Sequence, residues 1–234
     1  MRPVERGAAP SVGGSLKVVR DYGELREDLL AALDAYCSYC EAPLTAKPEV
    51  EHISPKARHA DARVDWNNLL LACGFCNPEK GSRDVDRSHD TDYVWPDRDN
   101  TFRAFVYGPG GTLKPTPTLP SELQKRAMRT RDLVGLNGPH LLLATDARKR
   151  RWNVRRQAWD RIQEARADLH ACDTPEMRRQ ILAHAKTMGF WSMWMALFAD
   201  DNTMCAALLD LLRGTSRACF DARGRPIPRP GGVL

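Results

Sequence analysis

The chain has 234 residues, 42% of them hydrophobic and 28% charged, and a formal net charge of +5. This length allows one large or two small domains, and the apolar content suffices for a packed core. The charge suits a polyanionic partner but is too small to establish one. The apolar run 190–199 is too short to cross a bilayer, and we expect no secretory signal peptide. We therefore expect a soluble cytoplasmic protein without membrane contact.

The first predicted elements are a flexible segment and a helix. Residues 1–14 contain two prolines and three glycines and are expected to form a flexible leader. Leucines at helical spacing then predict a helix that runs into the first cysteine pair, at Leu25, Leu29, Leu30 and Leu33. We expect residues 15–114 to form one domain that begins with this helix.

Two C-x-x-C pairs, Cys37 with Cys40 and Cys73 with Cys76, are separated by 32 residues. Four thiolates on two short turns are the ligand set of a closed tetrahedral zinc site. The alternatives are two disulfides, a redox C-x-x-C or small buried residues. An odd total of seven cysteines fits an oxidised framework poorly. We therefore predict one structural Zn²⁺ at these four residues, and buried free thiols at positions 172, 205 and 219.

A short strand carrying Glu51 and His52 is predicted between the cysteine pairs, where aliphatic residues flank both and a proline follows. A carboxylate beside an imidazole suggests a metal ligand next to a base. Asn77 directly follows Cys76, and with a proline in the first turn it would begin a helix. Glu51 and Asn77 would then offer two oxygen ligands to a hard divalent cation, leaving other positions to water and a phosphate.

The motifs EH, N-L-x-x-x-C and C-x-x-C-N-x-x-K-G resemble those of the HNH nucleases, in their zinc-stapled ββα-metal form, over residues 37–83. The resemblance implies that Glu51 binds metal, that His52 is the general base that activates water, and that Asn68 orients this histidine. Asn77 matches the metal ligand that is usually the last histidine of the motif. Because the chain has asparagine there, Mg²⁺ or Mn²⁺ is expected in place of a softer transition metal.

Phosphodiester hydrolysis needs a nucleophilic water, a base within hydrogen-bond reach, and positive charge on the developing pentacoordinate phosphate. His52 meets the second need, because a histidine with an ordinary pKa is mostly neutral near pH 7. Lys80 and Arg83 would lie near the phosphate path, and a solvated helix face is an equal alternative for both.

A wider set of motifs, from C-x-Y-C-E through E-H-x-x-P-K, W-x-N-L and WPD-x-DNT to L-x-G-L-N, spans residues 37–137. This layout resembles the HNH subunits of Septu-type and retron-associated anti-phage systems. In that group the nuclease works with an ABC-type or SMC-like ATPase, so the resemblance implies such a partner. The chain has no P-loop motif, so any ATP dependence would come from that other chain.

After the second cysteine pair, residues 93–96 and 101–107 are predicted as short strands, and Pro109-Gly110-Gly111 as a hairpin turn. Three prolines mark a linker at 115–120. Ser121 is expected to cap a helix that ends near Gly135 or Asn137. Residues 121–234 would form a mainly α-helical domain, helical to about residue 212 and ending in an extended tail. The predicted fold class is α+β: a ββα-metal core followed by this helical domain.

Residues 148–166 contain eight Lys or Arg against two acidic residues, with two tryptophans between them. Arg148, Arg151 and Arg155 are candidates to contact a phosphate backbone. The alternative is a solvated amphipathic helix whose buried side follows helical spacing, at Val154, Ala158, Ile162, Ala165 and Leu169.

The run from Phe190 to Phe198 has more apolar surface than one helix face can hold. Two stripes follow from the helical period: Trp191, Trp194, Met195 and Phe198 form one, and Phe190, Met193 and Leu197 form the other. One stripe would face the domain's own core. The other would meet a second copy of the chain or the ATPase, unless the helix is buried on all sides.

Two classes of function remain in competition: a metal-dependent endonuclease that cuts nucleic acid, with DNA favoured, and a zinc-stapled binding module that has lost cleavage. The set Glu51, His52, Asn68 and Asn77 favours the nuclease, because a decayed site would have lost at least one of these groups. An RNA-directed nuclease stays open, because a motif that grips the backbone reads few bases.

Overall fold

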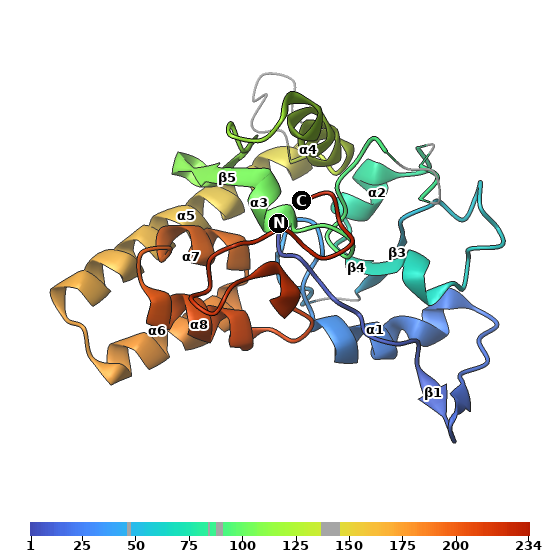
Figure 1. Cartoon of the computed structure of the whole chain (residues 1–234), viewed down its shortest axis with the longest axis horizontal. Coiled ribbons are helices and arrows are strands. Elements are labelled where there is room, and N and C mark those ends of the chain that lie inside the picture. The colour runs from blue at the N-terminus through green and yellow to red at the C-terminus, as the bar shows by residue number, and fades with distance from the viewer. Residues whose placement is uncertain (46–47, 84, 88–90, 137–145) are drawn as a thin grey trace.

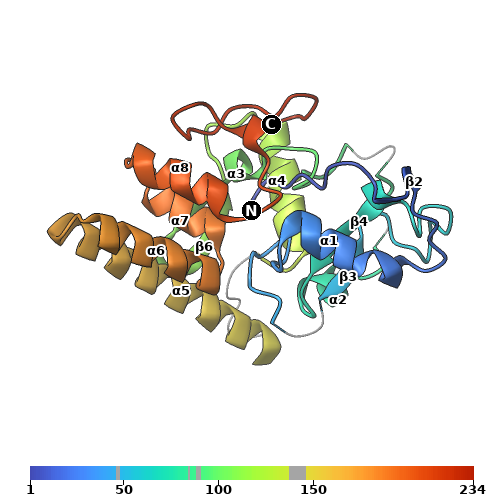
Figure 2. The ribbon, with the colours of Figure 1, turned by 90° about the horizontal axis from the view of Figure 1, so that it is seen from below.

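The computed structural model describes residues 1–45, 48–83, 85–87, 91–136 and 146–234, which form the predicted α+β structure. On one side lie α1 (Arg26–Leu33), β3 (Glu49–His52), β4 (Leu69–Ala72) and α2 (Cys76–Lys80). On the other lie α5 (Asp146–Ala171), α6 (Pro175–Met188), α7 (Trp191–Leu197) and α8 (Asn202–Leu211). Figures 1 and 2 show this separation in two views. Each side has its own hydrophobic cluster, which we call the first core and the second core.

The antiparallel pair β3–β4 carries the polar residues that the sequence singles out. Glu51 lies opposite Leu70, and His52 lies opposite Leu69. The three leucines that begin β4 are fully buried, and α1 packs against this strand. α2 follows β4 after the second cysteine turn and ends at Gly81, whose φ of +59° favours glycine because no Cβ is present.

The chain enters α1 through a turn that is itself capped, whereas the N-cap of α1, Leu25, has no side-chain cap. The 3₁₀ turn Tyr22–Leu25 precedes it, and Asp21 accepts a hydrogen bond from the backbone N of Gly23. Glu24 accepts one in return from the backbone N of Asp21, which completes a capping box. Leu29 and Leu33 are fully buried in the first core. The predicted helix is confirmed, and it leads directly to Cys37.

The predicted flexible leader is wrong for the first residues of the chain. Residues 1–4 are buried, and the guanidinium of Arg2 donates to the carbonyl of Leu33 at 2.8 Å and to Oγ1 of Thr215 at 2.9 Å. The backbone N of Val4 donates to the carbonyl of Pro96 at 2.6 Å. Farther on, β1 (Ser11–Val12) and β2 (Ser15–Leu16) form an exposed hairpin. Glycines mark turns here, and they do not make the whole segment free.

Residues 93–115 agree only in part with the prediction. Residues 93–96 are irregular chain ending in a turn, and 101–107 divides into α3 (Thr101–Ala104) and the start of β5 (Phe105–Gly108). The hairpin is confirmed: β5 pairs with β6 (Thr112–Pro115) through the 3₁₀ turn Pro109–Gly111. At Gly111, a Cβ would come within 2.7 Å of the carbonyl oxygen of Arg155, so this glycine lets the turn pack closely on α5.

The buried segment Trp95–Asn100 connects distant parts of the chain. Asp97 forms ion pairs with Arg6 at 2.5 Å and Arg87 at 2.6 Å. Burial alone would raise the pKa of Asp97, but these two guanidinium groups outweigh it and hold the pKa below its ordinary value of 3.8. The amide of Asn100 donates to the carbonyls of Cys219 and Ile227, both at 2.7 Å. The WPD-x-DNT motif, which begins at Trp95, therefore has a structural role.

The boundary between the two cores does not fall at the predicted linker, 115–120. α4 (Ser121–Leu133) packs on the first core through Ala127 and Leu133, so the described chain changes cores after residue 136. Pro120 takes the N-cap position, one residue before the predicted cap at Ser121. Gly135 follows the helix end, as expected, with a φ of +65°. Asn137, the alternative helix end, lies outside the described residues.

The second core is built by α5 to α8. On α5, Ala158, Ile162 and Leu169 are buried as predicted, whereas Val154 is 50% exposed. In α7 both apolar stripes are buried, and only Leu197 is half-buried. The prediction of an α7 stripe for a partner is therefore wrong. Cys205 and Cys219 are buried thiols, but Cys172 is exposed. None of the described helices combines the length and apolarity needed to span a membrane.

Candidate metal centre and active site

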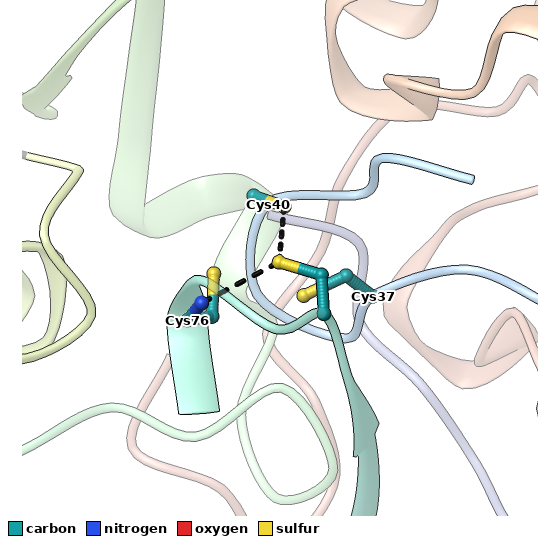
Figure 3. Close-up of side chains that lie close together, drawn as sticks. Cys37, Cys40 and Cys76 are labelled. Carbon is teal, nitrogen blue, oxygen red and sulfur yellow. Dashed lines mark hydrogen bonds between the residues drawn. The ribbon is translucent and has the colours of Figure 1, made fainter. Parts of the chain in front are cut away.

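The four cysteines converge, as their spacing predicts. Their Sγ atoms lie within 4.8 Å of one another, and Figure 3 shows Cys37, Cys40 and Cys76 drawn together. Sγ of Cys40 lies 3.7 Å from Sγ of Cys73. This distance excludes a disulfide, which needs about 2.05 Å. It is close to the edge, about 3.8 Å, of a tetrahedron with zinc–sulfur bonds of about 2.3 Å.

The pKa values of the four thiols differ in direction: burial raises those of Cys37 and Cys76 well above 9, whereas hydrogen bonds from neighbouring cysteines lower those of Cys40 and Cys73. Sγ of Cys73 accepts a hydrogen bond from the backbone N of Cys76 at 3.4 Å. A hydrogen bond from Cys37 lowers the pKa of Cys73 to about 7. Three of the four cysteines are buried and the fourth is partly exposed. Four soft donors within 4.8 Å of one another fit Zn²⁺, which would hold together the turns before β3 and after β4.

A cavity of about 320 Å³ lies beside β3 and α2, and Glu51, His52 and Asn77 all line it. β3 supplies the first two residues as neighbours, and α2 supplies the third, directly after the cysteine cluster. The cysteine cluster and this cavity therefore share α2. Three of the four predicted site residues meet at one cavity.

Glu51 is held from inside the protein by a buried lysine. Its Oε1 accepts a hydrogen bond from the phenol of Tyr39 at 3.3 Å and forms an ion pair with Nζ of Lys80 at 3.0 Å. Burial raises the pKa of Glu51 to about 7, against the opposing effect of Lys80. Lys80 also donates to the backbone carbonyl of His52 at 2.7 Å. One lysine therefore fixes both the carboxylate and the backbone beside it.

His52 has the geometry of a base with one nitrogen already occupied. Its Nε2 lies 2.9 Å from the carbonyl oxygen of Arg63. Because a carbonyl oxygen only accepts, Nε2 must carry the proton, which leaves Nδ1 unprotonated in the neutral ring. The ring of Tyr22 packs edge-on against the imidazole, with 4.7 Å between centroids. Burial lowers the pKa of His52 below 6.5, aided by Lys56 and Lys80, so the ring is neutral at pH 7.

The side chain of Asn68 hydrogen-bonds to the backbone of the chain between β3 and β4, whereas the resemblance implies that it orients the ring of His52. Its Oδ1 accepts from the backbone N of Ser54 at 2.7 Å, and its Nδ2 donates to the carbonyls of Ser54 and Ala62, both at 3.0 Å. The carbonyl that fixes the histidine ring belongs to Arg63, next to Ala62. Asn68 therefore holds the loop on which the partner of His52 lies, and any effect on the ring passes through that loop.

Asn77 is fixed by a carboxylate that the sequence analysis did not single out. Its Nδ2 donates to Oε2 of Glu49 at 2.7 Å, which leaves the amide oxygen of Asn77 available. Glu49 precedes Glu51 by two residues on β3, so both side chains leave the same face of the strand. The alternation of the strand was the signal that could have identified Glu49.

Five residues are expected to contact nucleic acid. For two of them the prediction is wrong, because their side chains lie inside the protein. Lys80 is 1% exposed and pairs with Glu51, and Arg155 is 4% exposed and donates to the carbonyl of Gly111 at 3.0 Å.

The other three expected contacts are closer to the surface but have partners within the chain. Arg83 is exposed and donates to the carbonyl of Leu133 at 2.9 Å. Arg148 pairs with Glu79 on α2, and Arg151 donates to Sγ of Cys76. Arg83 and Arg148 stay predictions as phosphate contacts. Arg151 also donates to the carbonyl of Val134, so both ends of its guanidinium have partners within the chain.

Lys56 is a cationic residue that lines the cavity, and it was not among the residues expected to contact nucleic acid. Its side chain is exposed and lines the cavity, with Nζ 2.6 Å from the hydroxyl of Tyr22 and 4.1 Å from the centroid of that ring. Lys56 ends the motif E-H-x-x-P-K, so its spacing from His52 was visible in the sequence. Only the fold shows that it lies at the same cavity.

Comparison with known proteins supports this geometry. Residues 37–83 match the family model described as HNH endonuclease. A stretch of 59 residues is 41% identical to the Septu protein PtuB of Bacillus thuringiensis. The matched stretch covers 24% of this chain and 23% of that relative. The resemblance to HNH nucleases is thereby confirmed for residues 37–83, which form an HNH endonuclease domain.

Proposed function

We propose that this protein is a metal-dependent endonuclease that hydrolyses phosphodiester bonds at the cavity between β3 and α2. One observation carries the proposal: His52 is held through Nε2 by the Arg63 carbonyl, in the same cavity as Glu51 and Asn77. A histidine fixed at one nitrogen and neutral at pH 7 is suited to remove a proton with the other nitrogen.

Each residue then has a separate role in the hydrolysis. Nδ1 of His52 takes a proton from the attacking water. Glu51 and Asn77 are the residues that would hold a divalent cation, with oxygen donors that suit Mg²⁺ or Mn²⁺. Such an ion supplies positive charge to the phosphate when it is bound. Lys56, exposed at the same cavity, would contact a phosphate of the substrate.

A binding module without cleavage is the weaker candidate. The pair Lys80–Glu51 is buried, and burying charged groups is costly unless they are paired. A fold that needed only to bind a nucleic-acid backbone would have no use for a fixed carboxylate, a fixed amide and a histidine with one nitrogen unprotonated.

We further propose that the substrate is DNA and that the protein acts in defence against phage together with an ATPase chain. The similarity to a Septu protein supports the defence role. A site that contacts the backbone does not by itself choose between DNA and RNA. A measurement of the mass in solution tests whether a second copy of this chain also takes part.

The test is a cleavage assay with purified protein on plasmid, single-stranded DNA and transfer RNA. Each substrate is incubated with Mg²⁺, Mn²⁺ or EDTA, with and without the candidate ATPase. We expect DNA to be cleaved, and we expect this cleavage to require the divalent ion. Cleavage of transfer RNA alone would replace the DNA proposal by the RNA one.

His52→Ala separates the nuclease from the binding module. We expect it to lower the rate of cleavage by about 10²–10⁴-fold, because the base acts only in the transition state. Zinc content should stay unchanged, and the protein should stay folded with a lower melting temperature, because the buried imidazole and its contact with the Arg63 carbonyl are lost. His170→Ala, at an exposed position on α5, is the matched control and should cleave like the parent. If His52→Ala cleaves every substrate as fast as the parent, this mechanism is wrong.

A further inference from the structure

Three arginines of α5 reach across to the cysteine cluster and to α2. Arg148 pairs with Glu79 on α2, and Arg151 donates through Nη2 to Sγ of Cys76 at 2.8 Å. Arg155 lies 3.5 Å through Nη1 from the carbonyl oxygen of Cys40. These residues are spaced by three and four positions, so they lie along one side of the helix. The three arginines belong to the helical part, and the three partners named here, Glu79, Cys76 and Cys40, belong to the HNH domain.

Arg151 is held in place by groups other than the cysteine. Its Nη1 donates to the carbonyl of Val134 at 3.2 Å, and its guanidinium lies 4.0 Å from the centre of the ring of Phe75. Phe75 lies between Gly74 and Cys76 in the second cysteine turn. A planar cation stacked on an aromatic ring is a favourable contact. The guanidinium is therefore fixed beside the cluster from two sides.

The charge of the cluster explains why a cation is needed there. Four thiolates around one Zn²⁺ have a net charge of −2, and Cys37, Cys40 and Cys76 are buried. Uncompensated charge inside a protein is costly. A hydrogen bond from a cation to a metal-bound sulfur reduces this cost directly, because the donor lies at the atom that carries the charge.

We propose that Arg151 is the counter-cation of the zinc–thiolate site, and that through it the packing of α5 sets how firmly the HNH domain keeps its zinc. Arg151 acts on the cysteines and is a positioning residue, because it lies among the zinc ligands and does not line the cleavage cavity. The proposal rests on zinc occupying the cysteine cluster and is independent of cleavage.

The first test measures zinc release from the full chain into a chromogenic chelator. Arg151→Gln removes the charge and should release zinc at about 10- to 100-fold lower chelator concentration, the usual effect of losing a group that supports a metal ligand. Arg151→Lys should lie between the parent and Arg151→Gln. Arg150→Gln, at an exposed neighbouring position, is the control and should match the parent. Equal zinc release from Arg151→Gln and the parent would overturn the proposal.

The second test uses the unmodified protein and remains decisive if Arg151→Gln does not fold. Hydrogen exchange is followed with zinc bound and after chelation. If Arg151 couples the two parts, chelation should raise exchange in the first turns of α5 as well as in residues 37–83. Exchange in α5 that is unchanged after the cysteine turns have lost zinc would show that the helix does not depend on the cluster. Neither measurement involves a nuclease substrate, so failure of the proposed cleavage leaves both results intact.

Discussion

Residues 37–83 bury charged and polar side chains beside their apolar ones, whereas residues 146–212 bury mainly aromatic and aliphatic ones. In the first segment Glu41, Glu51, His52, Asn68 and Lys80 are all less than 9% exposed. In the second, the buried side chains are mostly tryptophan, methionine, leucine and isoleucine. A polar interior depends on each partner, since losing one leaves the other unpaired. An apolar core loses stability gradually, one side chain at a time.

The largest expected difference between the two segments comes from removing a cysteine of the cluster. Cys73→Ser should lose zinc and unfold the HNH domain, because binding of a structural zinc is worth about 10–16 kcal/mol in small zinc-dependent folds. We expect low solubility, loss of cleavage, and a helical signal from the second core that persists in circular dichroism. Cys172→Ser, at an exposed cysteine, is the control. A parent protein with well under about half an equivalent of zinc would contradict the four-thiolate assignment.

The buried ion pair gives the next largest effect. Lys80→Met should lower the free energy of unfolding by up to about 3–5 kcal/mol above pH 7, because it leaves the Glu51 carboxylate buried without its cation, and by less below pH 7, where Glu51 is protonated. Lys80→Met combined with Glu51→Gln should recover part of this loss, since the unpaired charge is then removed. Chemical denaturation of the two single variants and the double variant measures the coupling. Additive losses would show that the pair is not what holds these side chains.

Asp97 provides a pH-dependent test outside the HNH domain. Its folded-state pKa is depressed, so its ionised form contributes stability above about pH 4 that is lost as pH falls through the folded value. Asp97→Asn should cost about 2 kcal/mol at pH 7, less than the Lys80 change because Arg87 keeps 20% of its side chain exposed. The difference from the parent should shrink below about pH 4. A constant difference from pH 7 to pH 3 would rule out this ion pair as the cause.

The smallest effect concerns substrate binding. Lys56→Ala should weaken nucleic-acid binding by about 1 kcal/mol and reduce the dependence of affinity on salt by about one ion. Melting temperature should not change, because the side chain is exposed. Lys186→Ala, an exposed change on α6, is the control. An unchanged salt dependence would remove Lys56 from the substrate contacts.

Part of the site could be predicted because spacing alone constrains it. Two C-x-x-C turns can bring four sulfurs to one point, and Glu51 and His52 are neighbours in any fold. The helices α5 to α8 followed from the 3.6-residue period. These features depend on contacts between near neighbours in sequence, or on a ligand set that admits few arrangements.

The remaining features depend on how distant segments meet. A lysine at the end of a short helix is usually solvated, and only the packing of α2 on β3 buries Lys80. The period of α7 shows two apolar stripes but not whether the chain itself covers both. The sequence predicts Arg151 and Arg155 on the surface, because it does not show that α5 lies against the cysteine turns.

α2 has only five residues, Cys76–Lys80, and four of them have separate duties: a cysteine ligand, an amide at the cavity, the partner of Arg148, and the anchor of Glu51. A helix turns by about 100° per residue, so inserting or deleting one residue would misdirect every side chain that follows. This turn and a half can therefore vary in evolution by substitution but not in length. Changes in length are expected in the exposed β1–β2 hairpin, whose residues do not line the cavity.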